Sequence, residues 1–221
     1  SNVAEGAGVF NLATGTVNYA QNIYEKLYPA STTKILTAYL ALKYGNLDDL
    51  VTVSEYAAKQ ASDSSVCGLK AGDVVSLRDL LYGMMLKSGN DAAIAIAEHL
   101  SGNVEAFADL MNQEANAMGA TRSHFVNPNG LPDEDHYTSV YDLYLIFQNA
   151  VKDDRFVDII STMSYDTSYT DASGNPVEKT WENTNQYLVG KETPPDGITV
   201  VGGKTGTTGA AGYCLVLYST N

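Results

Sequence analysis

The sequence predicts an α+β fold: an antiparallel sheet formed from both chain ends, covered by helices, with a mainly helical lobe inserted. β-Forming residues fill positions 7–20 and return after Ser161, whereas apolar residues at helical spacing fill the middle. The length of 221 residues suits one domain. We therefore expect a single domain over residues 1–221, with a sheet lobe at about 1–45 and 161–221 and a helical lobe at about 46–160.

Both ends of the chain carry strand signals. Residues 7–12 and 16–20 are β-rich runs joined through a Thr-Gly turn, which predicts a hairpin. After Ser161, β-forming residues recur as far as Tyr218, and polar turns interrupt them at 173–175 and 194–197. Many of these residues are tyrosines, which we expect on a half-buried sheet surface.

The middle of the chain carries helix signals with capping residues. Apolar side chains recur every three or four positions, and three runs follow a Ser or Asn that can accept hydrogen bonds from the first turn. Glycine, which tolerates the backbone conformation that ends helices, follows two of the runs. The predicted helices run from Ile35 to Gly45, from the Ser76 cap to Met85, from Asp91 to Leu100, from the Asn103 cap to Gly119, and from Ser139 to about Val151.

Composition excludes several classes of protein. The net charge is −13 and the isoelectric point is near 4.4. We expect no nucleic-acid partner, because phosphate contacts need clustered cations. No apolar run reaches the ~18 residues of a membrane span, and the first residues lack the basic and apolar regions of a signal peptide. Membrane attachment is therefore expected only through a segment outside these residues.

Cysteine and histidine are too few for the usual metal sites. The two cysteines, Cys67 and Cys214, are better explained as free buried thiols than as a disulfide, although pairing stays open. The three histidines show no H-E-x-x-H spacing, and no G-x-S-x-G elbow is present. We expect no metal and no other cofactor.

Ser31-Thr32-Thr33-Lys34 is the only S-x-x-K in the chain. On a helix, positions i and i+3 share a face, so the lysine amine would reach the serine hydroxyl. A lysine activates serine as a base only if its pKa falls from ~10.4 to about 7–8, a shift of about 4 kcal/mol. Desolvation, a helix N-terminus and a second cation all lower it. Taken alone, the motif is better explained as a helix cap followed by a solvated lysine.

Ser-Gly-Asn occurs three times, and one copy suggests chemistry. Residues 101–103 lie between two predicted helices and residues 173–175 precede a proline in a polar turn, so local structure explains both. Ser88-Gly89-Asn90 instead joins two strongly apolar helices. A pocket at a lobe junction explains this copy as well as a helix stop and cap do.

Lys204-Thr205-Gly206-Thr207 contains the only K-T-G. It lies in a glycine-containing β run, and glycines on a strand let a ligand backbone approach closely. A lysine and two hydroxyls on such a strand suit a carboxylate. A flexible hairpin with a surface lysine would have the same sequence features.

In this order, S-x-x-K, S-x-N and K-T-G resemble the motif set of the penicillin-recognising serine enzymes, which include the penicillin-binding proteins and serine β-lactamases. The flanks at 28–34, 88–93, 127–131, 181–185 and 202–206 are similar to those of low-molecular-mass D-alanyl-D-alanine carboxypeptidases, and the likeness extends from about Gly8 to Leu217. It implies a β-lactamase/transpeptidase-like fold. It also implies a bacterial cell-envelope enzyme, outside the cytoplasmic membrane, that removes the terminal D-alanine from peptidoglycan stem peptides and is acylated by β-lactam antibiotics.

The resemblance implies a catalytic role for four residues. Ser31 would be the nucleophile and Lys34 its general base. Ser88 would relay a proton toward the amine of the leaving D-alanine, and Asn90 would orient Lys34 and the substrate amide.

It also implies that the K-T-G strand binds the substrate. Lys204 would keep the first lysine neutral and attract the substrate carboxylate, while Thr205 and Thr207, on either side of Gly206, would hydrogen-bond that carboxylate. The backbone N–H groups of Ser31 and Thr207 would form an oxyanion hole, typically worth about 3–4 kcal/mol per donor.

Three related functions stay open. Class A β-lactamases activate water with a Glu in an E-x-x-L-N loop; no such pattern lies between Ser88 and Lys204, so slow release of bound penicillin is expected. A non-hydrolytic β-lactam sensor would carry the same motifs but needs a partner domain, and none is visible here. Endopeptidase action on cross-links would use identical residues.

Overall fold

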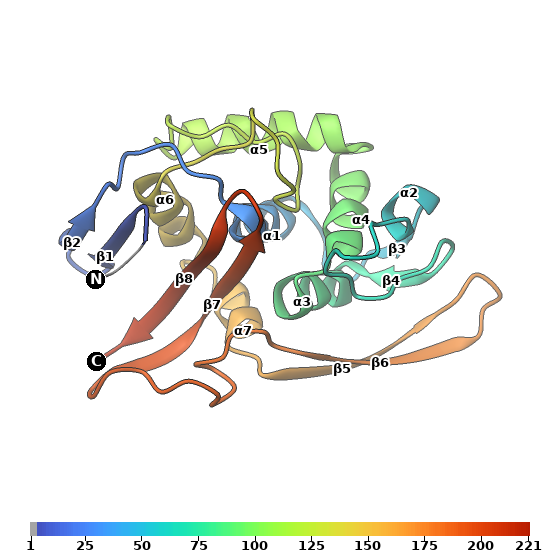
Figure 1. Ribbon diagram of the computed structural model, residues 1–221. Coiled ribbons are helices and arrows are strands. Elements are labelled where there is room, and N and C mark those ends of the chain that lie inside the picture. The colour runs from blue at the N-terminus through green and yellow to red at the C-terminus, as the bar shows by residue number, and fades with distance from the viewer. Residues whose placement is uncertain (1–3) are drawn as a thin grey trace.

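The computed structural model describes residues 4–221 and is built around one buried helix. Helix α1 (Lys34–Tyr44) has buried residues on every side, so it lies inside the protein rather than on its surface. In Figure 1 it lies in the middle of the molecule, with α6 on one side and α3 and α4 on the other. The surrounding helices are α3 (Leu77–Lys87), α4 (Asn90–Ser101), α5 (Val104–Ala117), α6 (Val140–Ala150) and α7 (Asp154–Ile160).

The predicted helix ends are confirmed by their capping bonds. The Ser76 hydroxyl accepts the N–H of Asp79 at 3.0 Å, and the Asn103 side chain accepts that of Ala106 at 2.7 Å. Ser139 caps α6 in the same way. These bonds satisfy N–H groups that have no partner within the first turn. Three elements were not predicted from the sequence: α7, the short helix α2 (Glu55–Ala58) and the 3-10 turn η1 (Ala30–Thr33).

The strands are antiparallel, as predicted, but over residues 4–221 they form three separate sheets. The two chain ends make two hairpins, β1–β2 and β7–β8, rather than one continuous sheet, and β1 and the end of β8 lie on the same side of the molecule (Figure 1). A four-stranded sheet contains the remaining strands. The strands are β1 (Ala7–Asn11), β2 (Thr16–Gln21), β3 (Leu50–Thr52), β4 (Val74–Ser76), β5 (Ser164–Thr170), β6 (Pro176–Glu182), β7 (Thr199–Thr208) and β8 (Gly212–Thr220).

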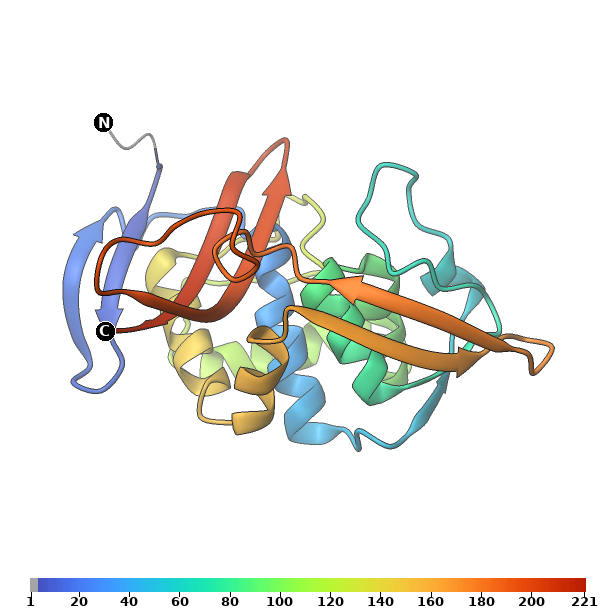
Figure 2. The same ribbon diagram turned by 90° about the horizontal axis from the view of Figure 1, so that it is seen from below.

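The β5–β6 hairpin corrects the predicted lobe boundary. Residues 164–182 were expected in the sheet lobe with the other C-terminal strands, but β5 pairs with β4 at the edge of the helical lobe. The reason is the apolar face of the hairpin. Tyr165 stacks on Tyr82 of α3 with ring centroids 3.9 Å apart, and Trp181 is buried in the same core. Figure 2 shows the hairpin running along α3.

The cysteines are unpaired, as the sequence favoured. Cys67 is buried beneath the α3–α4 junction, where its carbonyl accepts the indole N–H of Trp181 at 3.3 Å. Cys214 lies on β8 and is only partly buried, which differs from the expectation of two buried thiols. No helix within residues 4–221 is long and apolar enough to cross a bilayer.

Candidate active site

Ser31 and Lys34 are brought together by the start of α1. Ser31 lies in η1 and Lys34 begins the helix one turn later, so both side chains point to one side. The Lys34 Nζ atom lies 2.9 Å from the Ser31 hydroxyl oxygen. Lys34 is fully buried whereas Ser31 is partly exposed. A fully buried amine therefore faces a hydroxyl that solvent can reach, which excludes the solvated lysine that the motif alone favoured.

The α3–α4 junction contributes Ser88 and Asn90. Ser88 ends α3 in the left-handed conformation, at φ 59°, which costs a non-glycine residue about 1–3 kcal/mol. Its hydroxyl oxygen lies 3.3 Å from Lys34 Nζ, and the Asn90 side-chain oxygen lies 2.8 Å from the same nitrogen. Gly89 between them has no room for a side chain, because a Cβ there would lie 2.3 Å from the Cys67 sulfur.

Strand β7 brings the third motif to the same place. Lys204 is 1% exposed, and its Nζ atom lies 3.0 Å from the Ser88 hydroxyl and 2.6 Å from the Thr205 carbonyl oxygen. The Ser88 hydroxyl thus lies between two lysine amines. Thr205 and Thr207 occupy alternate positions of the strand and so share its other, more open face.

Gly206 lets β7 approach the backbone of Ser31. A Cβ at this position would lie 2.8 Å from the backbone nitrogen of Ser31 and 3.2 Å from that of Thr32. Real side chains do not approach backbone so closely, so only glycine allows this contact. The strand therefore lies directly beside the Ser31 N–H group.

Burial favours the neutral form of the Lys34 amine. Removal from water lowers the pKa of the Lys34 ammonium well below its usual range, and the positive charge of Lys204 lowers it further. A neutral amine has two N–H groups and one lone pair. Two carbonyl oxygens accept these N–H groups, that of the Asn90 side chain and the backbone carbonyl of Asn129 at 3.0 Å. The lone pair is then left for the Ser31 hydroxyl.

Lys204 is a second buried amine in the site. Burial lowers the pKa of Lys204 to about 7, so at neutral pH this amine exchanges readily between charged and neutral forms. An anion bound beside it would favour the charged form. Both lysine amines lie within hydrogen-bond distance of the Ser88 hydroxyl.

Two contributors to the site were not predicted from the sequence. The Asn129 carbonyl lies in the Asn-Pro-Asn-Gly segment, which was predicted only as a turn and a family-like flank. Asp91 is 1% exposed, and its carboxylate accepts the backbone N–H groups of Cys67, Gly68 and Leu69 at 2.8 to 3.0 Å. Asp91 therefore ties residues 67–69 to the start of α4. Its position directly after S-x-N was the available signal.

The other two Ser-Gly-Asn copies have the structural roles expected of them. Gly102 ends α4 at φ 87° and Asn103 caps α5, while Gly174 forms the turn between β5 and β6 at φ 81°. Neither copy contacts the lysines in the described bonds.

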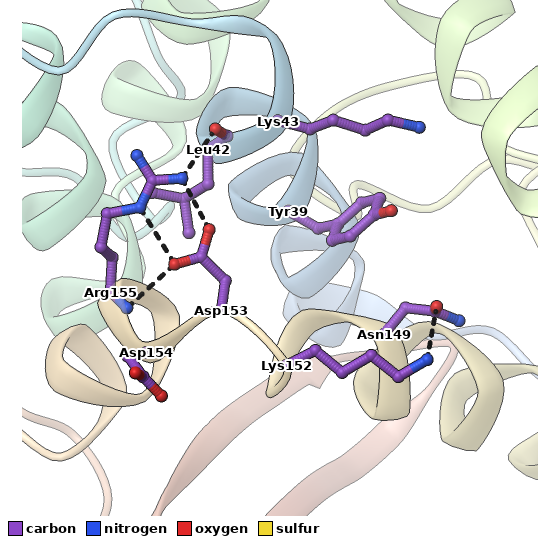
Figure 3. Close-up of a pocket in the computed structure, with 8 residues that line it drawn as sticks. All are labelled: Tyr39, Leu42, Lys43, Asn149, Lys152, Asp153, Asp154 and Arg155. Carbon is purple, nitrogen blue, oxygen red and sulfur yellow. Dashed lines mark hydrogen bonds and ion pairs between the residues drawn. The ribbon is translucent and has the colours of Figure 1, made fainter.

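A cavity of about 620 Å³ lies at the opposite end of α1, between α1 and the α6–α7 junction (Figure 3). The Arg155 and Asp153 charges in it are paired with each other. The Arg155 guanidinium donates to both Asp153 carboxylate oxygens and to the Leu42 carbonyl at 3.0 Å, and Lys152 faces Asn149. These bonds hold α7 against the end of α1. Within residues 4–221, no group of three His, Cys, Asp or Glu side chains has metal-binding geometry.

Comparison with known proteins assigns the family. Residues 2–221 match the peptidase S11 family, described as D-alanyl-D-alanine carboxypeptidase. The chain is 36% identical over 218 residues to the D-alanyl-D-alanine carboxypeptidase DacF of Bacillus subtilis, covering 96% of this chain and 53% of that protein. It is 33% identical to the D-alanyl-D-alanine carboxypeptidase of Streptomyces sp. strain K15, covering 98% of this chain and 76% of that protein.

A solved structure is similar over the whole chain. The crystal structure of the Streptomyces K15 DD-transpeptidase superposes with a TM-score of 0.91 at 32% identity, covering 100% of this chain and 86% of that one. Several of the curated relatives are longer, and the chain spans about half of their length. The family match and these similarities agree with the convergence of the three motifs on one buried lysine, and the chain belongs to the D-alanyl-D-alanine carboxypeptidase family, peptidase S11.

Proposed function

We propose that this chain is the penicillin-binding peptidase domain of a serine-type D-alanyl-D-alanine carboxypeptidase. Its substrate is a peptidoglycan stem peptide ending in D-Ala-D-Ala, from which it removes the last residue. The observation that carries this proposal is the buried Lys34 amine, 2.9 Å from the Ser31 hydroxyl and held by two carbonyl acceptors. It gives a serine a base without any histidine.

Acylation begins with a proton transfer. The Lys34 lone pair takes the hydroxyl proton of Ser31 while the serine oxygen bonds to the carbonyl carbon of the penultimate D-alanine. The carbonyl electron pair moves onto its oxygen. The N–H groups of Ser31 and Thr207 stabilise that oxyanion, and a water-poor site increases their effect.

The peptide bond then breaks. The new Lys34 proton passes through the Ser88 hydroxyl, 3.3 Å away, to the amine of the departing D-alanine. The carbon–nitrogen electron pair stays with that amine, and the shortened peptide remains as an ester on Ser31. In the second half of the reaction a water gives a proton to Lys34 and attacks the ester, and the serine oxygen leaves with a proton.

The substrate carboxylate binds along β7. The Lys204 charge attracts it, and the hydroxyls of Thr205 and Thr207 donate hydrogen bonds to it from the open face of the strand. Asn90 orients the substrate amide as well as Lys34. A carboxylate near Lys204 raises the pKa of that lysine above 7 and so keeps it charged during the reaction.

The proposal extends to inhibitors and location. A β-lactam ring is an amide that the same serine opens, but its leaving amine stays attached to the acyl group, so we expect slow release. Because the substrate is part of the bacterial cell wall, the domain works outside the cytoplasmic membrane, in a secreted or a membrane-anchored protein.

Intact mass measurement tests the proposal. Purified protein is mixed with penicillin and followed over hours, and D-alanine release from a peptide ending in D-Ala-D-Ala is measured in parallel. We expect one penicillin adduct that is lost slowly, D-alanine release, and neither signal in Ser31→Ala. Adduct formation without peptide turnover would favour a sensor, and rapid loss with penicillin hydrolysis would favour a β-lactamase.

A further inference from the structure

One loop segment covers one face of η1 and of the first turn of α1, the part of the chain that carries Ser31 and Lys34. We call residues 126–136 the strap. Ala30, Thr33, Lys34 and Thr37 have the spacing i, i+3, i+4 and i+7, so they form a single stripe along η1 and α1. The strap contacts all four, and each is 2% exposed or less.

Three of these contacts are made by the strap backbone. The Thr37 hydroxyl donates to the Pro128 carbonyl at 2.7 Å, and Lys34 Nζ donates to the Asn129 carbonyl at 3.0 Å. Gly130 has φ 91° and lies so close to Ala30 that a Cβ would be 1.8 Å from the Ala30 carbonyl oxygen. The Asn129 carbonyl position therefore depends on how the strap is held on the helix.

His136 makes the fourth contact and is 1% exposed. Its Nδ1 atom accepts the backbone N–H of Val126 at 3.1 Å, which requires that Nδ1 carry no proton. Its Nε2 atom, which then carries the proton, lies 2.9 Å from the Thr33 hydroxyl. The neutral ring thus closes the strap on itself through one nitrogen and ties it to the helix through the other.

We propose that His136 is a positioning residue for the reaction: it locks the strap onto the helix and so keeps the Asn129 carbonyl on the Lys34 amine. This inference rests on the proposed function. The effect on the reaction comes from the hydrogen bonds of the Lys34 amine, whose two N–H groups need two acceptors. If the Asn129 carbonyl moves away, one amine N–H loses its acceptor and the lone pair is no longer directed at Ser31 alone. Water also gains access to the amine.

The surroundings keep this histidine neutral. Burial lowers the pKa of His136 to about 4; among the charged and titratable groups facing it, Asp133 of the strap opposes that shift and His124 adds to it. The Phe125 ring packs edge-on at 5.5 Å, and the Thr33 hydroxyl on the helix side is uncharged. The hydrogen bonds of His136 to Thr33 and Val126 therefore persist throughout the neutral pH range.

Two single variants remove the hydrogen bond between His136 and Thr33, one by changing each partner. Thr33→Val keeps the shape of the buried side chain but removes the hydroxyl that His136 reaches. His136→Asn keeps an acceptor near Val126 but is too short to reach Thr33. The matched control is His99→Asn, which changes a histidine that instead pairs with Asp49 near the surface.

The measurement is the rate of Ser31 acylation by fluorescent penicillin from pH 5 to 10, together with the fraction folded. Both variants are expected to acylate about tenfold more slowly at pH 7, the size expected for one lost buried hydrogen bond. The acid limb of their profile shifts upward by about one pH unit, because a hydrated Lys34 regains part of its normal pKa. The rate approaches that of the wild type near pH 10. The double variant is no slower than either single one.

Other outcomes overturn the inference. If the variants acylate more slowly than the wild type by the same factor at every pH, His136 only stabilises the fold. If their pH–rate profiles equal that of the wild type, the strap does not position Lys34. If the wild-type protein itself is not labelled, the proposed function fails and this inference fails with it. A labelled wild type with unaltered variants overturns this inference alone.

Discussion

Replacing Gly206 by Ala should impair catalysis far more than stability. The added Cβ would lie 2.8 Å from the Ser31 nitrogen, about 0.6 Å inside an ordinary contact, and its neighbours are backbone atoms that cannot rotate away. Strand β7 must therefore move away from η1. This shift separates the Ser31 and Thr207 N–H groups that we propose as the oxyanion hole, and losing one such donor costs about 3–4 kcal/mol, or roughly 10²–10³ in rate.

The assay for Gly206→Ala is the second-order rate of penicillin acylation at pH 7, with thermal unfolding as a check on folding. Gly209→Ala is the control, because Gly209 lies just beyond β7 and a Cβ there meets nothing within 4 Å. We expect the control to behave as wild type. A Gly206→Ala protein that acylates at the wild-type rate would refute the placement of the oxyanion hole between η1 and β7.

Three further predictions concern Ser88, Asp91 and His136. Ser88→Ala should lower D-alanine release at least about tenfold by removing the hydroxyl between the two lysines, whereas Ser101→Ala and Ser173→Ala should not. Asp91→Asn keeps one acceptor oxygen where the carboxylate has two, which accept the N–H groups of residues 67–69 and of Ala92. Unfolding should therefore need about 2–4 kcal/mol less, and the melting temperature should fall by roughly 5–15 °C. His136 takes up a proton near pH 6.5 in the unfolded chain but only at about pH 4 in the folded chain. The neutral His136 ring therefore contributes about 3 kcal/mol to the free energy of unfolding above pH 6.5, and this contribution is lost as the pH falls from 6.5 to 4.

Each of these has a contrary outcome. Full activity in Ser88→Ala would remove the proton path through that hydroxyl, and loss of activity in Ser101→Ala would show that the wrong Ser-Gly-Asn was chosen. An unchanged melting temperature in Asp91→Asn would mean that residues 67–69 are held by other contacts. For His136, the free energy of unfolding by denaturant is measured from pH 4 to 7 in the wild type and in His136→Asn. If this free energy changes with pH equally in both proteins, the low pKa of His136 is contradicted.

Much of the fold was predictable because it is determined locally. The caps at Ser76 and Asn103 and the glycine at 102 act within one turn of the chain, so their residue types are sufficient signals. The lobe against which the β5–β6 hairpin packs could not be predicted in this way, because the apolar face of the hairpin would have suited either lobe. Contact with α3 through Tyr165 decided it, and that contact joins residues far apart in the sequence.

The candidate site divides in the same way. The motif residues Ser31, Lys34, Ser88 and Lys204 were recognisable by type, because a nucleophile and its base need particular side chains. The burial that lowers the pKa of Lys34 and the Asn129 carbonyl that accepts a hydrogen bond from its amine became visible only in three dimensions. Every residue has the same backbone carbonyl, so a role carried by the main chain leaves no mark on composition or spacing. Only the folded path of the chain brings that oxygen to the amine.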